Sequence, residues 1–491
     1  MSQNDQTLAL HAGHNTTRTE GTRAVPIYQT TSYVFDDTDH AAKLFSLAEP
    51  GYIYTRLNNP TADVLEQRLA SLEGGIAAVA TSSGSAALAT TLLTLLKTGD
   101  HIVSSNSLYG GTYNLLNVTL PRYGITTTFV DPNEVDSFSN AINENTRAIY
   151  IESMGNPKLD VLDIESISKI AKKAKLPLIV DNTVATPYLL KPINYGADIV
   201  IHSTTKYITG NGTSIGGIII DAGNFDWSNG LFDEFTEPSA GYHGLVYHDV
   251  LGPAAFIAKV RIEGLRDLGS APSPFNCFQT IQGLETLSVR IKKHSENALK
   301  VAEWLEKQSQ VAWVNYPGLK SSKYYELSQK YLKNGQSGIV TFGLKGGFDS
   351  AKKLPCLSEE TSRLSKPKAV FIRFFQPSKK LVDTKKRCCS LAFIGVPSTP
   401  RYTRGRIAMA RQLATRTRVK TPRVTFIVAT KTCLGQPTTA QFAPAWTLEL
   451  LASPTKLYSR RGWPKFNNVH MKSGSSLVIV SWLIYKNPGT D

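Results

Sequence analysis

One lysine in the sequence stands in a setting that suits covalent chemistry. Lys206 lies in the segment Ser203-Thr-Thr-Lys-Tyr-Ile-Thr-Gly210, directly after an apolar run that ends at Ile201. A lysine amine can form an imine with an aldehyde, and the hydroxyls of Ser203 and Thr205 can bind a phosphate. The segment therefore predicts a site for pyridoxal phosphate, an aldehyde that carries a phosphate. The alternative is a solvated lysine that closes a strand.

A second candidate anion site is the small-residue turn Ser82-Ser-Gly-Ser-Ala-Ala87, which lies between a short apolar strand and a long apolar run. A helix that starts in such a turn presents free backbone amides and the positive end of its dipole. Ser83, Gly84 and Ser85 are the candidate ligands for a phosphate. The turn lacks the Gly-Lys-Ser/Thr of a nucleotide-binding loop. A turn that only caps a core helix is the alternative.

Polar residues follow several other apolar runs. Asp181 comes directly after Leu178–Val180, where a half-buried carboxylate needs a partner. The partner could be an arginine, a helix end or the protonated nitrogen of a pyridine ring. Tyr109 follows another run and could lie flat against such a ring, and Asn156 follows a third.

These residues need a sheet that brings strand ends together. Strands are predicted at six places, with helical segments such as Ile164–Ala174 between them: His101–Ser105, Thr126–Val130, Ala148–Glu152, Leu178–Asp181, Asp198–His202 and Gly217–Ile220. This alternation predicts an α/β fold with a mostly parallel sheet and helices on both faces. Ligands of such sheets bind at the carboxyl ends of the strands.

The charge of the 491-residue chain, +15 overall, is unevenly distributed. Residues 351–491 hold 26 basic and 5 acidic residues, whereas residues 1–350 hold 28 and 34. The first part has the balance of an ordinary globular protein. A nucleic-acid partner is therefore not expected, despite the basic tail.

Several other classes are disfavoured by what the sequence lacks. No apolar run approaches the roughly 20 residues that cross a bilayer, and the polar start has no signal-peptide pattern, so a cytoplasmic protein without a membrane partner is expected. Five cysteines in a chain of this length do not make a disulfide framework. The nine histidines show no metal-ligand spacing, so no catalytic metal is expected.

Three segments taken jointly resemble the Cys/Met-metabolism family of pyridoxal-phosphate enzymes, over about residues 7–344. They are Ser203–Gly210, Ser82–Ala87, and Tyr54-Thr-Arg56 with Asn59-Pro-Thr61. The resemblance implies the aspartate-aminotransferase fold, known as fold type I, with a smaller α/β domain at the carboxyl end. The domains expected from it are an arm (1–60), a large cofactor domain (61–260), the start of a small domain (261–350) and a basic tail outside the family (351–491).

The resemblance also implies roles for individual residues. Lys206 would form the imine and move protons, Asp181 would pair with the ring nitrogen, and Tyr109 would stack on the ring. The other cofactor ligands would be Asn156 near the ring hydroxyl, Ser83, Gly84, Ser85, Ser203 and Thr205 at the phosphate, and Tyr54 and Arg56 at the phosphate of a neighbouring subunit. Such sharing implies a homodimer, usually paired into a tetramer. Asn211 departs from the family, which usually has a histidine there.

The segment from Phe225 to Gly244 resembles an insertion of the O-acetylhomoserine sulfhydrylases, although it could be only a packed loop. That branch implies γ-replacement: acetate leaves O-acetyl-L-homoserine and sulfide takes its place, which gives L-homocysteine for methionine biosynthesis. The alternative within the family is a cystathionine γ-synthase or lyase.

The resemblance stops near residues 346–353, where the family's small domain should continue. Neither the His-Pro…Thr-His segment nor the arginine that clamps the substrate carboxylate is found there. The tail, residues 351–491, is expected to be a nucleic-acid-binding extension, a disordered interaction tail or, the favoured explanation, a translation in the wrong reading frame. A chain that binds the cofactor but is inactive is therefore a further alternative.

Overall fold

The computed structural model describes residues 4–348, 350 and 351, together with the backbones of four strands between residues 368 and 440. The chain forms two compact units. The larger unit contains the described residues up to Glu303 and then Asn315–Gly338, and the smaller contains Trp304–Val314 and the described residues from Ile339 onward. Each unit is considered by itself.

A seven-stranded sheet forms the centre of the larger unit, in the order β1-β7-β6-β5-β4-β2-β3. The strands are β1 (Ala77–Thr81), β2 (His101–Ser105), β3 (Thr126–Val130), β4 (Thr146–Glu152), β5 (Leu178–Asp181), β6 (Ile199–His202) and β7 (Gly217–Asp221). β7 runs antiparallel to both of its neighbours, β1 and β6, and all other neighbouring strands of this sheet are parallel. The predicted mostly parallel sheet is thus confirmed, with small differences in the strand bounds.

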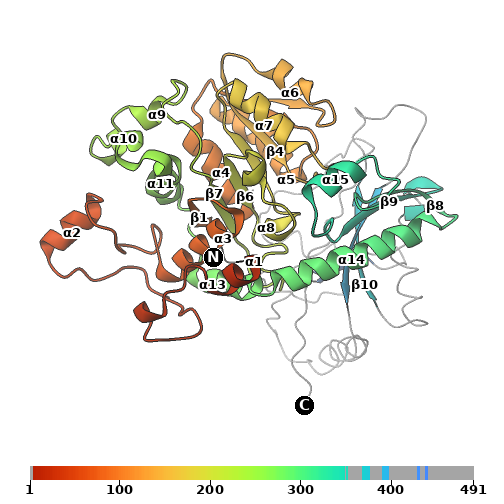
Figure 1. Cartoon of the computed structure of the whole chain (residues 1–491), viewed down its shortest axis with the longest axis horizontal. Coiled ribbons are helices and arrows are strands. Elements are labelled where there is room, and N and C mark those ends of the chain that lie inside the picture. Colours follow the sequence, from red (N-terminus) through yellow and green to blue (C-terminus); the bar gives the residue numbers. More distant parts are fainter. Residues whose placement is uncertain are drawn as a thin grey trace, which may run out of the picture. The chain divides into compact units, whose positions relative to one another are not determined.

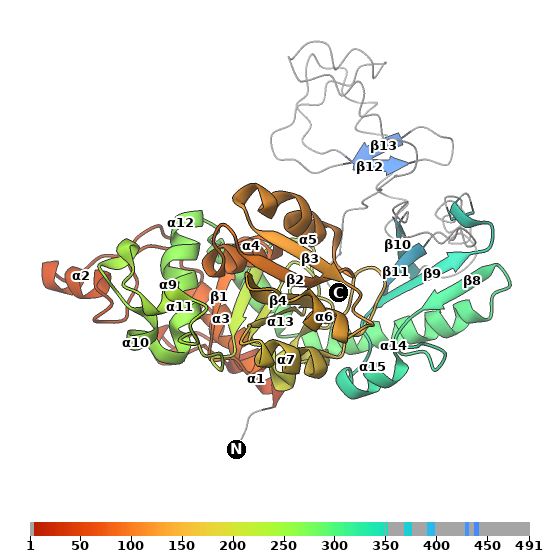
Figure 2. The same ribbon diagram turned by 90° about the horizontal axis from the view of Figure 1, so that it is seen from above.

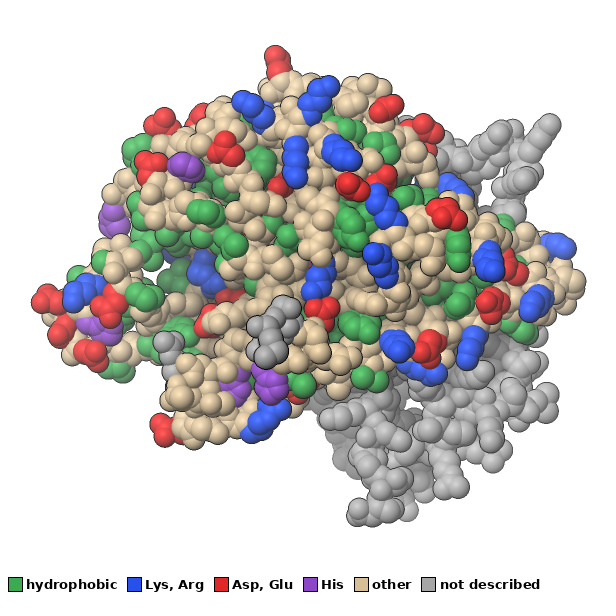
Figure 3. Space-filling view, in the orientation of Figure 1, with side chains coloured by type: hydrophobic (Ala, Val, Ile, Leu, Met, Phe, Trp, Pro, Cys, Tyr) green, Lys and Arg blue, Asp and Glu red, His purple; other side chains and the backbone are tan. Residues whose placement is uncertain are grey.

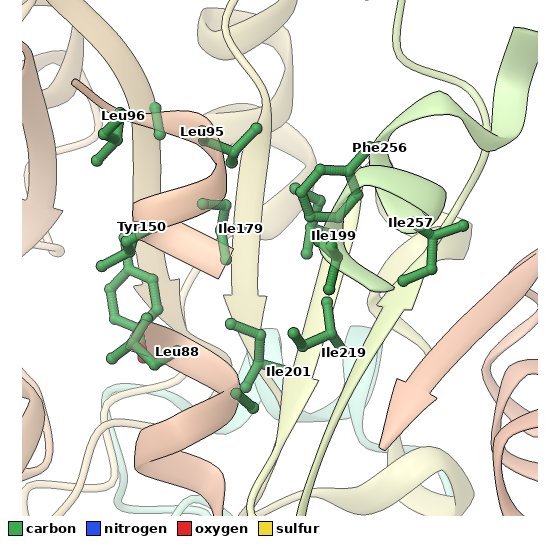
Figure 4. Packing of buried hydrophobic residues seen from close by; sticks show 14 of the residues in the cluster. Leu88, Leu95, Leu96, Tyr150, Ile179, Ile199, Ile201, Ile219, Phe256 and Ile257 are labelled. Carbon is green, nitrogen blue, oxygen red and sulfur yellow. The ribbon is translucent and has the colours of Figure 1, made fainter. Parts of the chain in front are cut away.

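Both faces of the central strands of the sheet are buried. Ile199 and Ile201 of β6 point to the face that α4 (Gly84–Leu95) covers, where Leu88 and Leu95 meet them (Figure 4). Val200 between them points to the other face and is also fully buried. Because neither face of the central strands β5, β6 and β7 meets water, these strands read as nearly continuous apolar runs. Their polar side chains lie at the strand ends, as Asp181 and His202 do.

Helices surround the sheet (Figures 1 and 2). Besides α4 they are α1 (Asp5–His11), α2 (Thr38–Phe45), α3 (Pro60–Glu73), α5 (Gly110–Asn114), α6 (Asp136–Ala141), α7 (Ile164–Lys173), α8 (Thr186–Leu189), α9 (Asp233–Thr236), α10 (Tyr247–Leu251), α11 (Ala255–Lys259), α12 (Arg266–Leu268), α13 (Pro274–Leu284), α14 (Leu287–Glu306) and α15 (Tyr325–Tyr331). Among the described residues, no helix has the length and apolar character needed to cross a membrane.

The segment from Phe225 to Gly244 is anchored by aromatic packing. The Trp227 ring is fully buried and stacks on Phe256 of α11 at 5.2 Å between ring centroids. Phe225 and Phe235 pack against the same indole, with centroids 4.5 and 4.6 Å away. The insertion is therefore joined to the core rather than loosely attached to it.

The smaller unit contains a four-stranded sheet in the order β10-β11-β9-β8. Its strands are β8 (Val311–Asn315, whose last residue belongs to the larger unit), β9 (Ile339–Leu344), β10 (Lys368–Phe375) and β11 (Ser390–Pro397), and β12 (Val428–Lys431) pairs with β13 (Pro437–Ala440). β9, which lies before residue 350, pairs with β11, which lies after it, so this sheet contains strands from both sides of that position. The other residues of the tail lie outside the described residues. The structure therefore does not test the three explanations given for residues 351–491, nor the expected absence of the arginine that binds the substrate carboxylate.

The surface of the described residues mixes both signs of charge. Figure 3 shows lysine and arginine side chains interspersed with aspartate and glutamate over the visible face. This distribution agrees with the nearly balanced charge of residues 1–350.

Asp221 offers a test of how tightly the sheet is packed, because burial raises its pKa from 3.8 to about 7. The unfolded chain then releases this proton at lower pH than the folded chain does, so stability is lost as pH rises from 3.8 to about 7. We expect Asp221→Asn to gain stability relative to the wild type by about 1.4 kcal/mol per pH unit across that window. Urea unfolding at several pH values measures the difference. A difference that does not change with pH would contradict the tight burial.

Candidate active site

The carboxyl ends of β4, β5 and β6 lie side by side in the sheet. Glu152, the last residue of β4, is the register partner of Asp181, the last residue of β5. Asp181 in turn is opposite Ile201 of β6. This edge therefore brings together the strand ends that carry Asp181 and, just beyond His202, the segment with Lys206.

Asp181 is a carboxyl group in a setting that favours a positive partner. Its Oδ1 accepts a hydrogen bond from the Thr183 amide at 2.9 Å, and its Oδ2 lies 3.5 Å from the Tyr150 hydroxyl. Burial raises the pKa of Asp181 above its ordinary value. A cation at Oδ2 would restore the charged form, as a protonated ring nitrogen does.

Glu152 belongs to this edge as well, although the sequence did not single it out as a ligand. Its Oε1 accepts a hydrogen bond from the Tyr109 amide at 2.6 Å, and the Asn156 amide also contributes to binding its carboxylate. Burial and the nearby charge of Asp181 raise the pKa of Glu152 well above its ordinary value. Glu152 thus joins the two loops that carry Tyr109 and Asn156. An acid that ends an apolar run, the signal that identified Asp181, could have identified it.

The ring of Tyr109 stands at the start of α5 and is partly exposed. Gly111 lies beneath it: a Cβ there would come 2.5 Å from the Tyr109 Cε1 atom. A glycine at this position therefore lets the ring lie close to the helix start. Asn156 is half-buried in the loop after β4.

The start of α4 meets the end of β6 at very close range. A Cβ at Gly84 would lie 2.4 Å from Cβ and 2.7 Å from Cα of Ser203, so only glycine fits there. Ser83 caps the helix, and its Oγ accepts from the Ala86 amide at 3.0 Å. The amides of Gly84 and Ser85 have no acceptor within the helix because they belong to its first turn. They can donate to an anion beside Ser203.

Lys206 lies in the turn between β6 and β7. The turn is closed by a hydrogen bond from the Gly210 amide to the Lys206 carbonyl at 2.9 Å. The Thr205 hydroxyl donates to the Gly216 carbonyl and accepts from the Gly216 amide, both at 3.1 Å. Thr205 therefore holds the base of the loop, while the Ser203 amide donates to Thr183 Oγ1 at 2.8 Å and ties the loop to β5.

Asn211, the departure from the family pattern, also has a structural partner. Its Nδ2 donates to Gln279 Oε1 of α13 at 3.2 Å, and its Oδ1 accepts from the Thr213 amide at 3.1 Å. Asn211 thus joins the loop that follows Lys206 to α13.

Tyr54 and Arg56 lie on the arm that precedes α3. The Arg56 guanidinium lies 5.4 Å from the centroid of the Tyr54 ring and donates a hydrogen bond to the Arg266 carbonyl. Both side chains are exposed. Their expected contact with a neighbouring subunit remains a prediction.

The residues at the strand ends fit pyridoxal phosphate. The α4 start offers amides and a dipole to the phosphate, Asp181 offers a half-buried carboxyl to the ring nitrogen, and Lys206 offers an amine. The Gly84–Ser203 contact is the observation that supports this fit, because a side chain at residue 84 would fill the space in which the helix start meets the β6 loop.

Gly84→Ala should disrupt the phosphate site without removing any ligand. The added methyl group would overlap Ser203, so we expect the affinity for pyridoxal phosphate to fall about tenfold or more. Gly241→Ala is the matched control, since its Cβ would have no neighbour closer than 3.8 Å. Titration of each apoprotein with the cofactor measures both. Equal affinities in the two variants would refute the close approach.

Comparison with known proteins agrees with this geometry. The sequence model of the family described as Cys/Met metabolism PLP-dependent enzyme matches residues 6–360. The O-acetyl-L-homoserine sulfhydrylase of Leptospira meyeri is 56% identical over 357 residues, which cover 71% of this chain and 81% of the relative. The homocysteine synthase of Schizosaccharomyces pombe is 52% identical over 356 residues, which cover 72% and 83%.

A solved structure supports the same fold. A Campylobacter jejuni protein described as an O-acetylhomoserine (thiol)-lyase superposes with a TM-score of 0.73 and 39% sequence identity, over 84% of this chain and 99% of that one. Its crystals contain N'-pyridoxyl-lysine-5'-monophosphate at position 205 of that protein. The match of the family to most of this chain and the fold type I architecture lead to one conclusion. The chain belongs to the Cys/Met metabolism PLP-dependent enzymes and uses pyridoxal 5'-phosphate as its cofactor.

Proposed function

We propose that this enzyme catalyses γ-replacement on O-acetyl-L-homoserine, with sulfide as the acceptor and with L-homocysteine and acetate as products. The observation that carries the proposal is the identity of 52–56% with relatives named as an O-acetyl-L-homoserine sulfhydrylase and a homocysteine synthase. The insertion between Phe225 and Gly244, packed onto the core through Trp227, supports the same branch of the family.

Pyridoxal phosphate, when bound, supplies an electron sink for negative charge that develops at the substrate α-carbon. The residues of this chain supply the rest. Lys206 is the base that removes the α-proton and returns a proton later. Asp181 keeps the ring nitrogen protonated, which strengthens the sink. Tyr109 would cover one face of the ring, and Glu152 holds the Tyr109 backbone through its amide.

The phosphate is held by the start of α4, from residues 83 to 85, and by Ser203. In this proposal Thr205 acts mainly through the loop, because its hydroxyl is engaged by Gly216. Asn156 would lie beside the ring hydroxyl. These contacts orient the cofactor so that the α-carbon meets the Lys206 amine, and the buried strand ends keep water from the reacting carbon.

Tyr54 and Arg56 complete the phosphate site of a neighbouring subunit in a homodimer, and two dimers form a tetramer. The support is their exposure on the arm, where a guanidinium and a phenol are available to a second chain. The enzyme works in the cytoplasm, in methionine biosynthesis, on the two small-molecule substrates O-acetylhomoserine and sulfide.

Purified enzyme should release homocysteine when it is given O-acetyl-L-homoserine and sulfide, and should prefer sulfide to cysteine as the acceptor. Lys206→Ala should lower this turnover by a factor of about a thousand or more, since the proton-transfer group is lost. Lys169→Ala, on the exposed face of α7, is the matched control and should keep full activity. Product analysis by mass spectrometry measures all three.

Two other outcomes would point elsewhere. A preference for cysteine would indicate a cystathionine γ-synthase or lyase. Bound cofactor without turnover on either acceptor would indicate a chain that binds the cofactor but is inactive, the alternative raised by residues 351–491. Full activity of Lys206→Ala would refute the assignment of the base.

A further inference from the structure

Four fully buried polar side chains lie beneath the strand ends of the site. Glu73 ends α3, Ser153 follows β4, Asn182 follows β5 and His202 ends β6. Their exposed fractions are 0%, 1%, 0% and 0%. Buried polar groups of this number need a reason, because each loses its contact with water. We call these four residues the Glu73 bracket.

The four side chains form one hydrogen-bonded chain. The His202 Nε2 atom lies 2.6 Å from Glu73 Oε1, and Asn182 Nδ2 donates to the same oxygen at 2.9 Å. The Ser153 hydroxyl donates to Asn182 Oδ1 at 2.8 Å. A carboxylate oxygen can only accept, so Nε2 of His202 is assigned as the donor to Glu73 Oε1. The Glu73 carboxyl group thus links the ends of β5 and β6 directly, and the end of β4 through Asn182.

Each strand-end member of the bracket is the sequence neighbour of a residue at the active-site edge. Ser153 follows Glu152, Asn182 follows Asp181, and His202 precedes Ser203. Consecutive residues of a strand point to opposite faces, so the bracket holds the same backbone from the side away from the cofactor. Displacement of Asn182 would move Asp181 with it.

Main-chain bonds carry this restraint to the cofactor ligands. The Asn182 amide donates to the Ile201 carbonyl at 2.8 Å, and the Ser153 amide donates to the Asp181 carbonyl at 3.0 Å. The Asn182 side chain also donates to the Leu190 carbonyl at 2.8 Å. The ends of β4, β5 and β6 are therefore locked in register on both their backbone and their buried face.

From these contacts we propose that the Glu73 bracket positions the cofactor site: it sets the place of the Asp181 carboxyl and of Ser203 relative to each other. The inference rests on the proposed cofactor site, because it assumes that Asp181 and Ser203 hold opposite ends of the ring. The four residues are positioning residues, since they act through their neighbours and do not touch the cofactor.

His202→Gln and His202→Asn form the central test. A glutamine amide nitrogen can occupy the place of Nε2 and reach Glu73, whereas the shorter asparagine cannot. We expect His202→Asn to weaken pyridoxal phosphate binding about tenfold and to shift the absorption spectrum of the bound cofactor, because one buried hydrogen bond is lost. His202→Gln should stay within about twofold of the wild type.

His101→Asn is the matched control for stability. This histidine is also buried, with Nδ1 2.9 Å from Thr146 Oγ1 and Nε2 2.8 Å from Thr128 Oγ1, but it starts β2 at the opposite end of the sheet. We expect it to lower the free energy of unfolding without changing the affinity or the spectrum of the cofactor. Ser153→Ala removes a single hydroxyl and should weaken binding about threefold even if His202→Asn does not fold.

The outcomes separate the bracket from the site itself. Cofactor affinity and spectrum unchanged in both His202→Asn and Ser153→Ala would overturn the positioning role. The same loss of affinity in His101→Asn would show a general effect of destabilisation and would also overturn it. If instead Lys206→Ala binds the cofactor with the spectrum of the wild type, the proposed cofactor site fails first, whatever the bracket variants do.

Discussion

Two carboxyl groups, Glu152 and Asp181, lie next to each other at the ends of strands that are buried on both faces. Burial raises the pKa of each, so the edge is poorly suited to two negative charges without a partner. Glu152 is satisfied by the amides of the loops that carry Tyr109 and Asn156. Asp181 Oδ2 accepts a long hydrogen bond of 3.5 Å from Tyr150, so a cation can still bind it, and we propose that this cation is the protonated pyridine nitrogen of the cofactor.

The other parts of the site depend on how closely the neighbouring elements approach this edge. Gly84 allows α4 to start against Ser203, which places free amides and the helix dipole beside the lysine loop. Thr205 and Asn211 tie that loop at both ends. The Glu73 bracket holds the strand ends from the opposite face. The cofactor site is thus a rigid edge, and Lys206 is carried by the loop that closes it.

Much of the fold could be predicted from the sequence. Strands with no polar residue inside them, such as Ile199–Ile201, can be predicted as short apolar runs. An acid directly after such a run is the reason that Asp181 was predicted as a cofactor ligand, and that role stays a prediction. Partners far apart in sequence were not accessible in this way. Glu73 and His202 are 129 residues apart. Glu152 accepts a hydrogen bond from the Tyr109 amide, and only the folded loop brings that amide to it. Tyr54 and Arg56 were recognised from the family resemblance, because their expected partner lies on another chain.

We propose that Lys206 holds the cofactor in a pocket made by Asp181 and the start of α4. Borohydride reduction of the cofactor-loaded enzyme, followed by peptide mapping with mass spectrometry, tests it most directly. We expect a phosphopyridoxyl group on the peptide that contains Lys206. A group on any other lysine, or an unmodified Lys206 in enzyme that retains the cofactor, would contradict it.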